Sequence, residues 1–234
     1  MWLSELKTTD LRSDTKHVFV VSLGSTEQHG PFAPLGSDTY IQDAILKSVE
    51  RILKKVIFLP TVPITHSTEH LGFMGTVTLE GDTLYAVMRD IANSLKESAK
   101  TLLFVSWHGG NKKTIDRFIE SEQANFDTVE LKQITIGDEK IDQVAEKLLG
   151  GPIDEHAGNA EVSLMLAVRP DLVRVPSPKE AKKPIAFSWD QPVKEVSKDG
   201  VIDNHPKWVV SEEIGNKLLD LYAANLVAKI RKYQ

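Results

Sequence analysis

Short apolar runs alternate with longer amphipathic stretches along most of the chain. Runs rich in β-branched and aromatic residues predict four strands, at Val18–Leu23, Val56–Leu59, Leu102–Ser106 and Val129–Ile134. Apolar residues at three- and four-residue spacing predict helices at Thr39–Leu53, Thr83–Ala99, Lys113–Ala124, Gly158–Val168 and Ser211–Arg231. Near-continuous apolar strands separated by helices indicate a mostly parallel sheet covered on both faces. The predicted fold class is therefore α/β, a three-layer α/β/α arrangement with a mostly parallel central sheet.

The stretch from Val175 to Trp208 breaks this alternation. It has scattered lysines, little periodicity and five prolines: Pro176, Pro178, Pro184, Pro192 and Pro206. We expect residues 175–208 to form a long irregular excursion with a short hairpin at most. Loops of this length in compact enzymes are usually lids or subunit contacts. A chain of 234 residues fits one large domain, so a single domain over residues 1–234 is predicted.

Composition and charge exclude several classes of protein. The net charge of −5 at pH 7, without a basic cluster, argues against a nucleic-acid-binding protein. No apolar run reaches the roughly 18 residues of a transmembrane helix, and the start of the chain lacks the basic and apolar regions of a signal peptide. The absence of cysteine leaves histidine and carboxylate side chains as metal ligands. We therefore expect a cytoplasmic enzyme with a small-molecule substrate and no nucleic-acid or membrane partner.

Polar motifs follow directly after two of the predicted strands. The first strand leads into a glycine-flanked segment with Glu27 and His29, whose alternate positions place both side chains on one side of an extended chain. The third strand leads into His108, followed by Gly109 and Gly110. Ligands and catalytic groups collect at the carboxyl ends of strands in α/β sheets. A metal-dependent hydrolase is therefore the leading hypothesis.

Two further carboxylates have ordinary structural explanations when each is taken alone. Asp38 precedes the helix predicted from Thr39, where Asp is a favoured N-cap. Glu161 falls in the first turns of another helix, where acidic residues complement the helix dipole. Taken together with the strand-end motifs, they complete a set of carboxylates and histidines that is large enough for two divalent ions: Glu27, His29, Asp38, His108, His156 and Glu161.

Five motifs, in the same order, resemble those of the creatininase (creatinine amidohydrolase) family. They are Gly24–Pro31, Pro34–Asp38, Ser67–His70 with Gly75 and Thr76, His108–Asn111, and His156–Gly158 with Glu161. The resemblance covers nearly the whole chain. It implies a three-layer α/β/α domain and a homo-oligomer, usually a hexamer.

The resemblance also implies a binuclear metal centre. One ion would be held by Glu27, Asp38 and His108, and the other by His29, Asp38 and Glu161, with Asp38 bridging. Oxygen and imidazole ligands suit Zn²⁺ or Mn²⁺, and also Fe²⁺. His156 would be the acid that protonates the departing nitrogen; a supporting residue at the helix start is the alternative. The residues expected to contact substrate are Ser67, His70, Trp107, Gly109 and Gly110.

The chain differs from creatininase itself at positions that, in creatininase, surround the substrate creatinine. Creatininase has a tyrosine and a glutamate where Gly109 and Gly110 stand, and a tryptophan and an aspartate where Pro152 and Ile153 stand. Many relatives also carry a glutamate in place of Asn159. Creatinine is therefore not the expected substrate.

The expected activity is that of a metal-dependent amidohydrolase acting on a non-peptide C–N bond, such as a cyclic amide or a formamide. Other hydrolases of the same family remain alternatives, namely a peptidase of cofactor maturation and a hydrolase of an inositol-derived ketone. A metal site that only braces an oligomer is a non-catalytic alternative. A metallophosphoesterase is disfavoured because no arginine lies near any motif.

Overall fold

A four-stranded parallel sheet lies at the centre of the computed structural model, which describes residues 1–11, 14–177, 180, 185, 187 and 191–234. Its strands are β1 (His17–Leu23), β2 (Val56–Phe58), β3 (Ala99–Ser106) and β4 (Glu130–Thr135). Their order across the sheet is β2-β1-β3-β4, and every neighbouring pair is parallel. The predicted mostly parallel sheet is confirmed.

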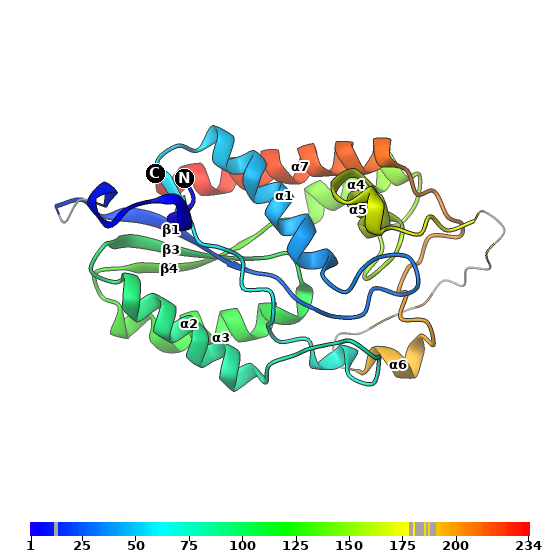
Figure 1. The fold of residues 1–234 in the computed structure, drawn as a ribbon, viewed down its shortest axis with the longest axis horizontal. Helices are drawn as coiled ribbons and strands as arrows, with labels where there is room; N and C mark the ends of the chain where they lie inside the picture. Colours follow the sequence, from blue (N-terminus) through cyan, green and yellow to red (C-terminus); the bar gives the residue numbers. More distant parts are fainter. Residues whose placement is uncertain (12–13, 178–179, 181–184, 186, 188–190) are drawn as a thin grey trace.

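Helices cover both faces of this sheet (Figure 1). One face carries α1 (Ser37–Ile52), α4 (Glu139–Leu149), α5 (Asn159–Val168) and α7 (Glu212–Ile230). The other face carries α2 (Gly81–Leu95) and α3 (Lys112–Glu122). The three-layer α/β/α fold predicted from the sequence is therefore confirmed. In the part of the chain that the structure describes, no helix is long and apolar enough to cross a membrane.

Alternate residues of the central strands belong to two separate hydrophobic cores. Val18 and Val20 of β1 pack with α1 and α7, whereas Phe19 and Val21 face α2 and α3. Successive side chains of a strand point to opposite faces, so a strand covered on both sides must be apolar at nearly every position. This requirement explains the continuous apolar runs in the sequence.

The connections after β1 and β3 leave the sheet on opposite faces. The chain passes from β1 to α1 on one face, and from β3 to α3 on the other, although β1 and β3 are neighbours. In doubly wound folds this reversal opens a crevice outside the carboxyl ends of the two strands. The loops that carry the polar motifs, 24–36 and 107–111, begin at this crevice.

Local signals explain where the helices differ from the predicted ones. Helix α4 was not predicted, although Asp138 caps it by accepting a hydrogen bond from the Ile141 N–H at 3.3 Å and Gly150 ends it at φ 69°. The helix predicted to reach Ala99 ends at Leu95, because Ala99 already belongs to β3. The N-cap of α1 is Gly36, so the explanation of Asp38 as a helix cap is wrong.

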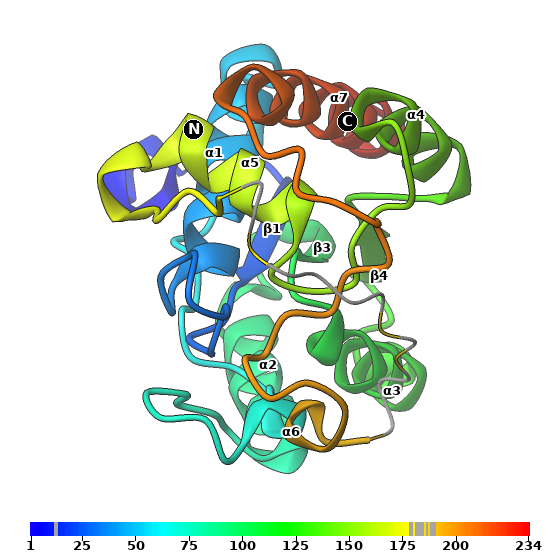
Figure 2. The ribbon, with the colours of Figure 1, turned by 90° about the vertical axis from the view of Figure 1, so that its right-hand side faces the viewer.

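In the segment 175–208, residues 191–208 cross the end of the molecule at which the strands terminate, as the orange ribbon in Figure 2 shows. The described residues of the segment contain one short helix, α6 (Val193–Val196), and one bridge, between Ile202 and His156. They form no hairpin. The main-chain N–H of Ile202 donates to the His156 carbonyl at 2.8 Å, and the His156 N–H donates back at 3.0 Å. This segment therefore supports the loop that carries His156.

Candidate metal centre

Six polar side chains converge beyond the carboxyl ends of β1 and β3. They form three groups whose ligand atoms lie within 4.8 Å of one another: Glu27–Asp38–His108, His29–Asp38–Glu161 and Glu27–His29–His156. The first two groups are the two ligand sets implied by the sequence resemblance, and they share Asp38. The structure thus brings together all five residues proposed as ligands, while their binding of metal remains a prediction.

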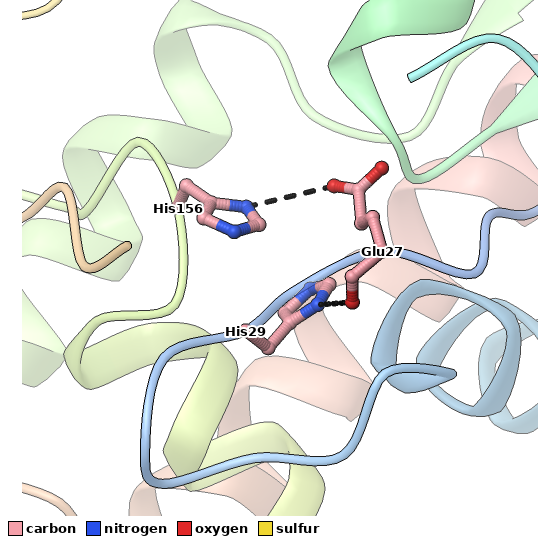
Figure 3. A group of neighbouring side chains, drawn as sticks. All are labelled: Glu27, His29 and His156. Carbon is pink, nitrogen blue, oxygen red and sulfur yellow. Dashed lines mark hydrogen bonds and ion pairs between the residues drawn. The ribbon is translucent and has the colours of Figure 1, made fainter. Parts of the chain in front are cut away.

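Separate elements deliver these side chains to one place. Glu27 and His29 lie on the loop after β1, where the Glu27 N–H donates to the Leu35 carbonyl at 2.9 Å. Asp38 and Glu161 lie in the first turns of α1 and α5. Figure 3 shows that the His156 ring reaches the Glu27 carboxylate from the loop before α5.

Main-chain carbonyls set the proton positions on two of the imidazoles. His29 Nδ1 lies 3.1 Å from the Glu27 carbonyl oxygen, so its Nε2 faces Asp38 at 3.5 Å. His108 Nε2 lies 2.9 Å from the His66 carbonyl oxygen, so its Nδ1 faces Glu27 Oε1 at 3.1 Å. A ring nitrogen beside a carbonyl keeps its proton, so the other nitrogen is the one that would bind a metal after losing its own proton. Metal-binding histidines are oriented in this way.

Two of the carboxylates are held by hydrogen-bond donors. Asp38 Oδ2 accepts from the Ser25 hydroxyl at 2.6 Å. Glu161 Oε1 accepts from the indole N–H of Trp107 at 2.8 Å, and its Oε2 accepts from the Ala157 N–H at 2.6 Å. These contacts fix which carboxylate oxygens turn toward the shared centre.

Glu27 is a fully buried carboxylate without ordinary partners. Neither of its carboxylate oxygens accepts a hydrogen bond within the described ranges, and His29 Nε2 also lacks one. The nearest imidazole nitrogens, of His108, His70 and His156, lie 3.1, 3.2 and 3.7 Å from Oε1. A buried charge is costly unless it is paired or coordinates a metal. Unpartnered oxygen and imidazole donors aimed at one point therefore fit a divalent cation.

In the metal-free cluster, protons on the side chains occupy positions at which cations would bind. Burial raises the pKa of Glu27 to about 7, against the opposing charge of His108. Burial lowers the pKa of His29, but the carboxylates of Asp38 and Glu161 outweigh it and raise this pKa to about 10. Burial also disfavours the charged form of Asp38, yet His29 holds the pKa of Asp38 well below its usual range. Without metal, His29 is an imidazolium between two carboxylates.

His156 differs from the proposed ligands in its electrostatics. Its Nε2 lies 2.7 Å from the Gln28 carbonyl oxygen, and its Nδ1 lies 3.7 Å from Glu27 Oε1. Burial lowers the pKa of His156 well below its usual range, and the positive charge of His29 lowers it further. His156 is therefore neutral and presents a bare nitrogen to the cluster, so it must accept a proton before it can donate one.

A cavity of about 310 Å³ opens onto the cluster. Two of the residues expected to contact substrate, Trp107 and Gly109, line it together with Lys112 and Tyr222. The other three, Ser67, His70 and Gly110, are not among its lining residues.

Ser67 and His70 are buried, and Gly110 lines a neighbouring cavity of about 430 Å³ with Glu69 and Lys113. The Ser67 hydroxyl has no hydrogen-bond partner among the residues that are described. Burial lowers the pKa of His70 to about 3, so its ring is neutral. Direct contact of Ser67, His70 and Gly110 with a substrate remains a prediction.

Two further residues support the cluster. Glu69 was equally well explained by its sequence as a pocket residue or as part of a polar turn, and its Oε1 lies 3.3 Å from His108 Nε2. Gln42, one helical turn after Asp38, was not identified from the sequence; it donates to the Val105 carbonyl at 3.1 Å and accepts from the Trp107 N–H. The signal that the sequence offered was a glutamine four residues after a proposed ligand, among the apolar positions of the same helix.

Several known proteins are similar to this chain in sequence or in fold. A family model described as creatinine amidohydrolase matches residues 4–230. A mycofactocin precursor peptide peptidase from Mycobacterium tuberculosis is 30% identical over 169 residues, which is 68% of this chain and 62% of the relative. Creatinine amidohydrolase from Pseudomonas putida is 29% identical over 174 residues, with 67% and 66% covered. The chain thus matches less than two thirds of the mycobacterial peptidase.

More distant relatives widen the range of chemistry. The 3-dehydro-scyllo-inosose hydrolase of Thermotoga maritima is 25% identical over 166 residues, 67% of this chain and 51% of the relative. A solved creatininase with Mn superposes with a TM-score of 0.80 at 20% identity, covering 99% of this chain and 98% of the other, which supports the fold. Together with the family model, which spans nearly all residues, these findings establish that the chain belongs to the creatininase (creatinine amidohydrolase) family.

Proposed function

We propose that the chain is a metal-dependent amidohydrolase that hydrolyses a non-peptide C–N bond of a small molecule with two divalent ions. The observation that carries the proposal is the buried carboxylate of Glu27, which has no hydrogen bond within the described part of the chain and lies beside Nδ1 of His108 and Nδ1 of His156. Such a centre needs cations, because unpaired buried charge opposes folding.

The residues would divide between two ions. Glu27, Asp38 and His108 would hold one, and the group that shares Asp38 with His29 and Glu161 would hold the other. Oxygen and imidazole donors favour Zn²⁺ or Mn²⁺, with Fe²⁺ also compatible. Solved creatininases named for Mn and for a Zn-Zn form support this choice.

The chain's own groups would manage the proton during hydrolysis. Bound ions would supply a water of lowered pKa and polarise the carbonyl under attack. Nδ1 of His156 is bare and close to the cluster, so it would take the proton from the attacking water and pass it to the departing nitrogen. The Nε2–H of His156 would stay hydrogen-bonded to the Gln28 carbonyl throughout, which would keep the ring oriented.

Both the relatives and the cavity support the bond and substrate class. The names creatinine amidohydrolase and precursor peptide peptidase both describe cleavage of amide C–N bonds. A cavity of about 310 Å³ matches the lower end of the volume of small-molecule sites, roughly 300–1,000 Å³. A cyclic amide or a formamide fits this volume better than a long peptide.

The hydrolysis of a cyclic ketone is the second candidate, because one relative is named as such a hydrolase. A purely structural metal site is less well supported. A structural site is closed by four ligands, whereas this cluster faces a cavity and has a neutral histidine at its edge.

The proposal is tested with purified protein loaded with Zn²⁺ or Mn²⁺. We expect about two ions per chain by elemental analysis, and turnover of one member of a panel of cyclic amides and formamides that stops after chelation. The panel also includes short peptides and cyclic ketones. Turnover of a ketone alone, or of an amide by metal-free protein, would contradict the proposal. Metal binding without turnover of any class would favour the structural site.

A further inference from the structure

The side chain of Gln28 lies between two imidazoles of the cluster. It is 5% exposed, and its amide nitrogen lies 3.0 Å from His70 Nδ1 and 2.9 Å from His156 Nε2. The same nitrogen donates to the Gly200 carbonyl at 3.1 Å, and the amide oxygen accepts from the Gly30 N–H at 2.9 Å. Every polar atom of this amide is therefore engaged.

Main-chain groups determine which end of the amide is nitrogen. The Gly30 N–H can only donate, so it must meet the amide oxygen. The Gly200 carbonyl can only accept, so it must meet the amide nitrogen. The orientation of Gln28 thus follows from two backbone groups and not from an assumption about either histidine.

The proton on His156 is placed by the main chain of Gln28. His156 Nε2 lies 2.7 Å from the Gln28 carbonyl oxygen, and two acceptors would repel at that distance. Nε2 therefore carries the proton and cannot accept a second one from the Gln28 amide. The bare Nδ1 is left facing Glu27, as Figure 3 shows.

The amide must then donate its second hydrogen to His70. One hydrogen goes to the Gly200 carbonyl, and among the residues that the structure describes the other is directed at His70 Nδ1 as its acceptor. A ring that accepts at Nδ1 carries its proton at Nε2. His70 Nε2 lies 3.2 Å from Glu27 Oε1, so the protonated nitrogen faces that carboxylate as an electrostatic contact and not as a hydrogen bond. Two rings thus present opposite groups, one N–H and one bare nitrogen, to the same carboxylate.

We propose that Gln28 is a positioning residue that fixes the proton of His70 through its side chain and that of His156 through its main chain. This inference deepens the proposed function, on which it rests. With these proton positions, His156 can accept a proton from water, while His70 turns its protonated nitrogen to the Glu27 carboxylate. With His70 reversed, a lone pair would face the Glu27 carboxylate and repel it.

Gly200 holds the amide from the other side. Its φ is 86°, and a Cβ there would collide with Gln28 Oε1. The position therefore requires glycine both for its backbone conformation and for the close approach of the amide. Substitution of Gly200 by alanine would displace the Gln28 amide without altering its chemistry.

The experiment is nitrogen NMR of histidine-labelled, Zn²⁺-loaded protein, with the His70 and His156 signals assigned by their loss in single His→Asn variants. In the unaltered protein we expect Nδ1 of both rings to resonate as unprotonated and Nε2 of both as protonated. In Gln28→Met, the His70 Nδ1 signal is expected to shift toward the protonated position. The His156 signals should keep their proton assignment, because the main-chain carbonyl remains.

Gln123→Met is the matched control, because Gln123 bonds the main chain of Phe126, Val129 and Leu131, away from the cluster. It should leave both rings unchanged. If Gln28→Met does not fold, Gly200→Ala should give the same selective shift of His70. Protonation of His70 Nδ1 in the unaltered protein, or an unchanged His70 in the folded Gln28 variant, would overturn the inference. The readout needs no substrate, so failure of the proposed hydrolase activity would leave it unaffected.

Discussion

Trp107 donates its indole N–H to Glu161 Oε1 at 2.8 Å and so connects the end of β3 to the first turn of α5. The ring of Trp107 also packs edge-on against Tyr222 of α7, with centroids 4.9 Å apart at 82°. The indole is thus fixed on one side by packing and holds a proposed metal ligand on the other. Trp107 is expected to contact substrate, and this hydrogen bond gives it a second role, the orientation of Glu161.

Trp107→Phe should weaken one metal position more than the other. Phenylalanine keeps much of the packing but removes the donor to Glu161, and loss of such a supporting bond typically costs about 10–100-fold in metal affinity. Titration of metal-free protein with Zn²⁺ against a competing chelator should show that one ion binds with lower affinity and that the affinity for the other is nearly unaffected. Trp2→Phe is the control, because Trp2 packs on Phe58 at 5.7 Å, away from the cluster. Equal weakening of both ions would contradict the assignment.

Asp38→Asn should be the most damaging single change at a ligand. Asp38 belongs to both candidate groups, so the neutral amide removes a charged ligand from each. Elemental analysis after dialysis should find well below one ion per chain. Asp43→Asn, five residues later on α1, is the control, since Asp43 bonds Thr61 instead. Retention of two ions in Asp38→Asn would show that the bridging role is wrong.

Metal affinity should fall as the pH is lowered. The pKa of His29 in the metal-free protein is about 10, and against the effect of burial Glu27 holds the pKa of His108 well above its usual range, so binding at neutral pH must release a proton from each ring. Above pH 7 and below these two pKa values the affinity should fall by about a hundredfold for each pH unit lowered. Below the pKa of Glu27, about 7, a third proton must also leave, and the slope should approach about a thousandfold per unit. Zn²⁺ competition titrations between pH 6 and 8 would measure this, and a flat profile would refute it.

Creatinine should not be a substrate at a rate ordinary for enzymes, about 1–10³ s⁻¹. A Cβ at Gly110 would collide with the Glu69 carboxylate and with the His108 ring. The glutamate that creatininase carries at this position therefore cannot be accommodated without moving a proposed metal ligand. A creatine-release assay on Zn²⁺- and Mn²⁺-loaded protein checks this, with the enzyme from Pseudomonas putida as positive control. Turnover in the ordinary range would show that other pocket residues compensate.

The sequence predicted the layers from local patterns, and it predicted where the polar motifs gather, while the resemblance to a family supplied the proposed ligand sets. Buried parallel strands require continuous apolar runs, and their carboxyl ends gather the motifs that follow them. The role of Gln28 could not be read in this way, since it depends on Gly200, 172 positions later in the chain. The contribution of Trp107 to Glu161 likewise depends on how β3 and α5 approach each other. Local pattern locates polar groups, while their hydrogen-bond partners are set by tertiary contacts.

His156→Asn tests whether this residue moves a proton or binds a metal. The main-chain bonds of His156 to Ile202 do not involve its ring, so the loop should keep its conformation in the variant. If Nδ1 only accepts and returns a proton, both ions should stay while kcat falls by about 10²–10⁴-fold, the usual size of general acid–base effects. His17→Asn at the start of β1 is the control and should change neither quantity.

The competing role is metal binding, because His156 also forms a candidate group with Glu27 and His29. In that case metal content should fall together with activity. A ligand role requires an ion near His156 Nδ1, whereas a proton-transfer role requires only that this nitrogen stay bare and within reach of the attacking water. The lowered pKa of His156 keeps it bare at neutral pH in either case, so kinetics alone cannot separate the two. Metal content measured beside kcat separates them, and we expect unchanged metal with a reduced rate.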